Sequence, residues 1–79
     1  MVWASMRLSA VLRQEGSQWT GWNPELDIAS QGRTEPEALA NLREAVELYL
    51  EDEDATAPHR TTLTTFEVKY GSPAGAFGP

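Results

Sequence analysis

Apolar and polar residues alternate over the first part of the chain. Between Ser5 and Gln14 the even positions are mostly apolar and the odd positions mostly polar, with Val11 as the exception. A period of two is typical of a strand with one buried face. Glu15 to Gln18 has turn composition, and Trp19 to Asn23 then resumes a stretch rich in β-favouring side chains. We therefore predict a β-hairpin.

A third strand follows the hairpin and leads directly into a helix. Pro24 ends the hairpin because proline has no N–H to donate to a ladder, and Leu26 to Gln31 forms a third short strand. Gly32 supplies the conformational freedom for the turn into the helix. Thr34 is the predicted N-cap, and Glu37 stands three residues on, as in a capping box.

The predicted helix carries a single apolar stripe. Pro36 lies in its first turn, where a missing N–H does no harm. Apolar residues then recur at helical spacing: Ala38, Leu39, Leu42, Ala45, Val46, Tyr49 and Leu50. A helix of about 17 residues is marginal alone in water. We expect it to bury this stripe against a sheet.

The helix is followed by an acidic run and by a final strand pattern. The run is Glu51, Asp52, Glu53 and Asp54, and we expect fraying there because the macrodipole disfavours anions at a helix C-terminus. Ala55 to Arg60 is the connection. Thr61 to Tyr70 alternates again and predicts a fourth strand, with Thr64, Phe66, Val68 and Tyr70 facing inward.

This order of elements predicts the fold class. A β-β-β-α-β chain forms a two-layer α+β sandwich, an antiparallel-dominated sheet with one helix on one face. Residues 1–70 make one domain, and the Gly/Pro-rich segment 71–79 is expected to remain disordered. Because the other face and the edges of the sheet lack cover, we expect a homodimer or higher homo-oligomer built through the sheet.

Composition narrows the classes of partner. Six basic residues against twelve acidic residues give a net charge of −6, which opposes phosphate backbones, so no direct nucleic acid binding is expected. The charge suits a basic protein partner, or it serves only solubility. No apolar run is long enough to span a bilayer and no secretory signal opens the chain, so we expect a cytoplasmic protein without membrane attachment.

Taken in order, three stretches resemble the HicB antitoxin family. They run from Asn23 to Gly32, from Thr34 to Ala38 and from Asn41 to Leu50. The resemblance covers Leu8 to Leu50 well and the last strand weakly. It implies a partial ribonuclease-H-like β-β-β-α-β fold, and its fold-motif residues here are Pro24, Leu26, Gly32, Thr34, Glu37, Ala38 and Asn41.

The resemblance also implies a function. HicB-like domains bind and silence HicA, a small basic toxin that cleaves messenger RNA, so the chain is expected to be a non-catalytic antitoxin. Many members add a DNA-binding module, but only nine residues follow Tyr70, and operator binding is not expected of this chain. The alternative is an orphan structural or regulatory module that keeps the fold without a cognate toxin.

Two carboxylates near a strand junction are the main candidates for chemistry. In a ribonuclease-H-like setting Glu25 and Asp27 could ligate a divalent ion, but two-metal hydrolysis needs further carboxylates, and none is apparent. His59, the only histidine, has no acid or nucleophile near it in sequence. We therefore expect no catalytic residue, metal or cofactor. The two acids either contact a basic partner or are solvated charges.

The remaining candidates are residues for protein binding. Trp19 and Trp22 are separated by an odd number of positions, so on a strand they face opposite ways. We expect Trp22 to be exposed and able to anchor a partner. The acidic residues Glu51, Asp52, Glu53 and Asp54 either imitate an RNA phosphate path for a basic nuclease or form an ordinary solvated helix end. The candidate partner-binding set is Trp22, Glu25, Asp27 and this acidic run.

Overall fold

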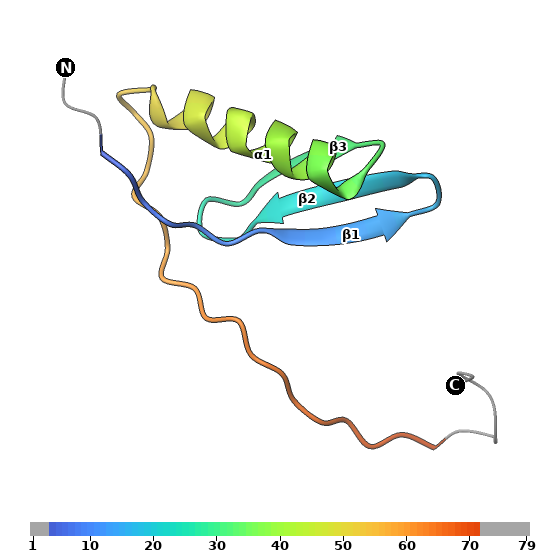
Figure 1. Ribbon diagram of the computed structural model, residues 1–79. Helices are drawn as coiled ribbons and strands as arrows, with labels where there is room; N and C mark the ends of the chain where they lie inside the picture. The colour runs from blue at the N-terminus through green and yellow to red at the C-terminus, as the bar shows by residue number, and fades with distance from the viewer. Residues whose placement is uncertain (1–3, 72–79) are drawn as a thin grey trace.

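A three-stranded antiparallel sheet and one helix form two layers (Figure 1). The computed structural model describes residues 4–71. The strands β1 (Val11–Glu15), β2 (Gln18–Asn23) and β3 (Ile28–Gly32) lie in the order β1-β2-β3, and α1 (Glu35–Leu50) crosses one face of the sheet. The predicted α+β arrangement of three strands followed by a helix on the sheet is therefore confirmed.

The predicted hairpin is confirmed, but its first strand is shorter than expected. Glu15 pairs with Gln18 across a two-residue turn, and Gly16 has a φ of 63° there, a conformation that glycine adopts without steric cost. β1 begins at Val11, so the expected strand residues before it lie outside the ladder. β2 ends at Asn23 because Pro24 follows. Since Val11 already pairs with Trp22 at that end, the residues before Val11 have no part of β2 to pair with.

Glycine brings the helix unusually close to the sheet. A Cβ at Gly32 would lie 2.6 Å from the backbone nitrogen of Ala38 and 2.9 Å from the carbonyl carbon of Glu37. Gly32 is not among the glycines with positive φ, so the reason predicted for it is wrong. Close packing of β3 on the first turn of α1 requires glycine there, rather than an unusual backbone angle.

Thr34 caps the helix as predicted, but the return bond of the predicted capping box is made one residue early. The Thr34 hydroxyl accepts a hydrogen bond from the Glu37 backbone N–H at 3.2 Å, and proline occupies the first turn. The Glu37 carboxylate reaches back to the N–H of Arg33 at 3.3 Å, one residue before the position expected in a capping box. The Asn41 side chain donates to the carbonyl of Gln31 at 2.8 Å, which ties the middle of α1 to the end of β3.

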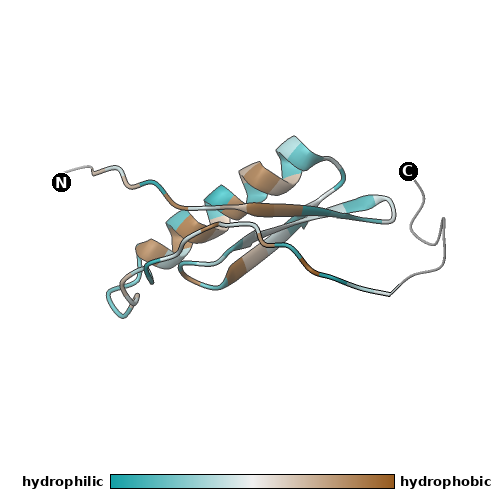
Figure 2. Ribbon diagram, turned by 90° about the horizontal axis from the view of Figure 1, so that it is seen from below, coloured by the Kyte–Doolittle hydropathy of each residue, from teal (hydrophilic) through white to brown (hydrophobic). Residues whose placement is uncertain are grey.

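The apolar core is small and lies under the centre of α1. Ala38, Leu42 and Val46 are buried, whereas Leu39, predicted to belong to the stripe, is 39% exposed. The helix packs mainly on β3, less on β2 and least on β1. Apolar and polar residues alternate along α1 (Figure 2). The flank of α1 on the β1 side is therefore incompletely covered, which explains the exposure of Leu39.

The predicted fourth strand is wrong for the described chain. Thr61 to Tyr70 belongs to no ladder, and the segment extends away from the sheet on the side opposite α1 (Figure 1). Phe66 is 84% exposed and Val68 66% exposed. A favourable strand composition does not make a strand without a neighbouring edge to pair with. Residues 1–3 and 72–79, and so Trp3 and most of the predicted Gly/Pro-rich tail, lie outside the described residues.

The close contact at Gly32 generates the first prediction. Gly32→Ala should lower the free energy of unfolding by about 2 kcal/mol, because the new methyl group meets backbone atoms that cannot move without shifting the helix. Urea unfolding followed by circular dichroism measures this loss. The matched control is Gly71→Ala, where a Cβ would have nothing within 4 Å; equal stability of the two variants would contradict the close packing.

Candidate protein-binding surfaces

A buried polar cluster organises the turn between β2 and β3. Asn23 and Glu25 are 1% and 7% exposed. The Asn23 amide donates to the Ser9 carbonyl and to Glu25 Oε1, both at 2.8 Å, while its own oxygen accepts from the Leu26 N–H at 2.9 Å. All polar atoms of this side chain are thereby used, as burial requires.

The Glu25 carboxylate joins this cluster to the segment before β1. The backbone N–H of Ser9 donates to Glu25 Oε1 at 2.7 Å, and this hydrogen bond is the main reason that the pKa of Glu25 lies below its ordinary value. Burial opposes the shift in smaller measure. The Glu25 carbonyl also accepts from the His59 N–H at 2.8 Å. The turn therefore binds both the segment before β1 and the segment after α1.

The structure gives Glu25 an internal position. It was predicted as a candidate partner contact, but its buried carboxylate already accepts hydrogen bonds from the protein. The sequence did contain a signal for this, because an Asn whose side chain bonds the backbone a few residues on is a common turn device. Asn23 was not among the predicted candidates, although its side chain makes three hydrogen bonds in the turn.

Trp22 is exposed, as predicted, and its ring is oriented by Asp27. The side chain of Trp22 is 41% exposed, whereas Trp19 is half-buried. The indole Nε1–H of Trp22 donates to Asp27 Oδ1 at 2.8 Å. Asp27 has a φ of 55°, a left-handed conformation that Asp tolerates better than most residues. The two predicted candidates therefore form one contact at the end of β2.

Trp22, near the end of the central strand β2, projects from an open face of the sheet. Val11 and Ala29 are its partners on the neighbouring strands, so the three side chains project from the same side of the sheet. Thr20 stands next along β2 on this side. We call Val11, Thr20, Trp22 and Ala29 the open face. α1 covers the other side of the sheet (Figure 1).

The acidic residues gather on the outside of the helix layer. Eleven of the twelve acidic residues are exposed, Glu25 being the exception. Eight of them belong to α1 or to the turn that follows it. α1 ends at Leu50, so the acidic run lies beyond the helix. A turn follows in which the Asp54 N–H donates to Asp52 Oδ1 at 2.9 Å.

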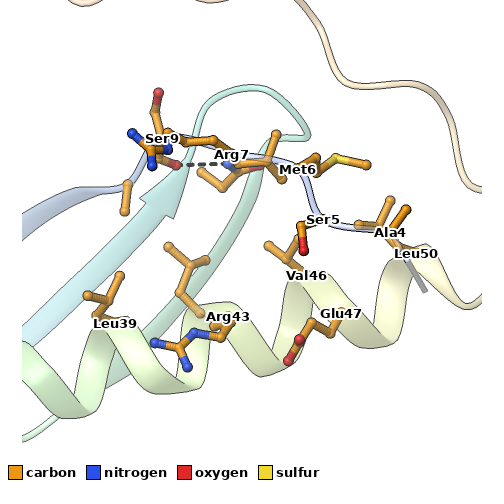
Figure 3. A pocket seen from close by; sticks show the side chains of 14 residues that line it. Ala4, Ser5, Met6, Arg7, Ser9, Leu39, Arg43, Val46, Glu47 and Leu50 are labelled. Carbon is orange, nitrogen blue, oxygen red and sulfur yellow. Dashed lines mark hydrogen bonds between the residues drawn. The ribbon is translucent and has the colours of Figure 1, made fainter.

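A groove lies between residues 4–10 and the flank of α1 (Figure 3). Its volume is about 910 Å³. Apolar residues from both walls line most of it: Met6, Leu8, Ala10, Leu39, Val46 and Leu50. Arg7 on one wall and Arg43 and Glu47 of α1 on the other add charged groups (Figure 3). The groove marks the place where the sheet and the helix do not close on each other.

Within residues 4–71 no three His, Cys, Asp or Glu side chains come together to hold a metal ion. His59 contributes its backbone N–H to the turn. Over the same residues, no helix is both long and apolar enough to cross a membrane. The candidate sites are thus the open face with Trp22 and Asp27, the acidic helix layer and the groove.

The position of Glu25 predicts a dependence of stability on pH. Its folded pKa lies below the ordinary value of 4.5, so its contribution is complete above that value and disappears as the pH falls through the folded pKa. Glu25→Gln has no such titration. The difference in free energy of unfolding between parent and variant should therefore be larger at neutral pH than at about pH 3.

Urea unfolding at the two pH values tests this expectation. Glu44→Gln is the matched control, because it removes a carboxylate from an exposed position on α1 and should cost less stability at neutral pH. A parent and a Glu25→Gln variant that lose stability in parallel on acidification would show that the buried carboxylate does not contribute.

Comparison with known proteins identifies no relative of the chain. No family model, no curated protein and no solved structure matches the chain. Any functional assignment therefore depends on the residues and surfaces themselves.

Proposed function

We propose that the chain is a HicB-like antitoxin domain, a non-catalytic protein that neutralises a HicA-like RNA-cleaving toxin by binding it. The ordered stretches that resemble the family are the starting point. The observation that carries the proposal is the distribution of charge, because eleven of the twelve acidic residues are exposed and most lie on one layer. A ribonuclease that binds RNA through basic residues is the kind of protein such a surface attracts.

The acidic layer supports fast and selective encounter with a basic toxin. Glu51, Asp52, Glu53 and Asp54 extend the acidic surface of α1 to the end of the molecule where the β2–β3 turn also lies (Figure 1). Complementary potentials raise the rate of association more than they lower the rate of dissociation. The same charge disfavours RNA and DNA as direct ligands.

The open face supports a stable complex once the partners meet. Trp22 is an exposed aromatic side chain flanked by Val11 and Ala29, and tryptophan is among the commonest residues of interface hot spots. Its hydrogen bond to Asp27 holds the ring in place before binding. A preoriented ring loses less conformational freedom when a partner packs on it.

Inhibition of RNA cleavage tests the function directly. Purified chain is added in excess to a HicA-like ribonuclease from the same source, and cleavage of a labelled RNA is followed. Cleavage should stop at saturating chain, and the chain alone should leave the RNA intact. Undiminished cleavage would reject the antitoxin function, leaving the orphan structural or regulatory module, which keeps the fold without a toxin.

Variants separate the two surfaces. Glu53→Lys should slow association with the toxin by about threefold to tenfold at low ionic strength, and the effect should shrink in high salt. Trp22→Ala should instead speed dissociation and raise Kd by about 30-fold. Surface plasmon resonance measures both rates.

The control for charge is Glu15→Lys, which makes the same charge change at the hairpin end of the sheet, away from the acidic run (Figure 1). If Glu15→Lys slowed association as much as Glu53→Lys, net charge alone would explain the attraction. If Trp22→Ala bound like the parent, the open face would not be the contact.

A further inference from the structure

The segment Thr61–Tyr70 has the composition of a strand but no place in the sheet. Four of its ten residues are threonine, and Phe66 and Val68 lie two positions apart in an alternating pattern. Phe66 and Val68, on one face of the alternation, are 84% and 66% exposed, and Leu63, on the other face, is 65% exposed. We call Thr61–Tyr70 the arm. Exposed apolar residues at strand spacing mark a surface that gains free energy when an edge pairs with it.

The fold also has a free edge and an unfilled groove that match the arm. Among the described residues, β1 pairs only with β2. Residues 4–10 continue the line of β1 outside the ladder and form one wall of the groove, with Leu39 and Val46 of α1 on the other (Figure 3). A strand added along this edge would place alternate side chains against the apolar groove. Ten extended residues span about 33 Å, enough for residues 4–10 and part of β1.

The direction of the arm points to the groove of another molecule. The hydrogen bond from His59 to the Glu25 carbonyl, at 2.8 Å, fixes the start of the arm at the end of the sheet. The arm then leaves on the side of the sheet opposite α1 (Figure 1), whereas the groove lies on the α1 side of residues 4–10 (Figure 3). The resulting molecule is elongated, with dimensions of 60 × 28 × 18 Å.

Charge and core size favour the same occupant. From His59 onward the chain has Arg60 and Lys69 against the single acid Glu67, whereas the preceding residues have four arginines against eleven acids. The arm therefore approaches an acidic body without adding to its negative charge. Only Ala38, Leu42 and Val46 are buried apolar residues among those described, so each body has apolar surface still to cover.

We propose that two copies of the chain exchange arms, each arm joining the free edge beside β1 of the other copy and filling its groove. In a dimer with two-fold symmetry, both arms pair with an edge and both grooves are occupied through the same contact. Phe66 and Val68 face the partner's groove, and Thr65 and Glu67 face away from it. The exchange does not depend on the antitoxin function.

Light scattering on the full chain is the first test. The parent should have twice the 8.7 kDa mass of one chain at high micromolar concentration. Val68→Asp should weaken dimerisation about 100-fold, because it replaces an apolar side chain with a charge against the apolar part of the groove. Thr65→Asp makes the same change of charge on the opposite face of the arm and should leave the mass nearly unchanged. Circular dichroism checks that both variants keep the helix.

Crosslinking separates exchange between copies from folding back within one chain. The chain has no cysteine, so Ala10→Cys combined with Val68→Cys introduces a defined pair, with each single variant as a control. A short bismaleimide should give a covalent dimer through the pair. A monomeric parent, equal dissociation by the two Asp variants, a dimer unaffected by Val68→Asp, or a crosslink confined to one chain would each overturn the proposal.

Discussion

The hydrogen-bonded carboxylate of Glu25 is the interaction on which the arrangement of the chain depends. Through its side chain and its backbone carbonyl, this residue ties together Ser9, Asn23 and His59. A buried carboxylate is tolerated only when hydrogen bonds replace its hydration, and here both donors come from segments that must meet at one end of the sheet. The polar cluster thus aligns the segments that precede β1 and follow α1 with the β2–β3 turn, while the apolar layer supplies non-directional attraction.

The second constraint is how little apolar surface the helix buries. α1 approaches β2 and β3 closely because Gly21 and Gly32 leave room for it, and three buried apolar side chains form the centre of the contact. Close packing of small residues is efficient per atom but excludes only a modest area from water. A fold of this kind gains much from a second molecule that covers the groove and the open face, and these are the surfaces we assign to binding.

The acidic helix layer, the open face and the groove differ in their chemistry, and each therefore suits a different kind of partner. The acidic helix layer is complementary in charge to a basic protein, the open face carries Trp22, oriented by Asp27, and the groove lies beside the edge of the sheet at β1. The surfaces meet at Glu47, which belongs both to the acidic helix layer and to the groove, whereas Trp22 and Asp27 do not line the groove.

Local chemistry in the sequence determined most of the elements. Alternation predicted the hairpin, the absence of an N–H in Pro24 ended β2, and Thr34 with Glu37 set the start of α1, because these effects act within a few residues. The tertiary structure decided what depends on distant neighbours: the burial of Glu25 against Ser9, the need for glycine at position 32 and the exposure of Leu39. The tertiary structure also decided that Thr61–Tyr70 is not a strand. A strand forms only beside the edge of another strand, and the sequence pattern does not show whether such an edge is near.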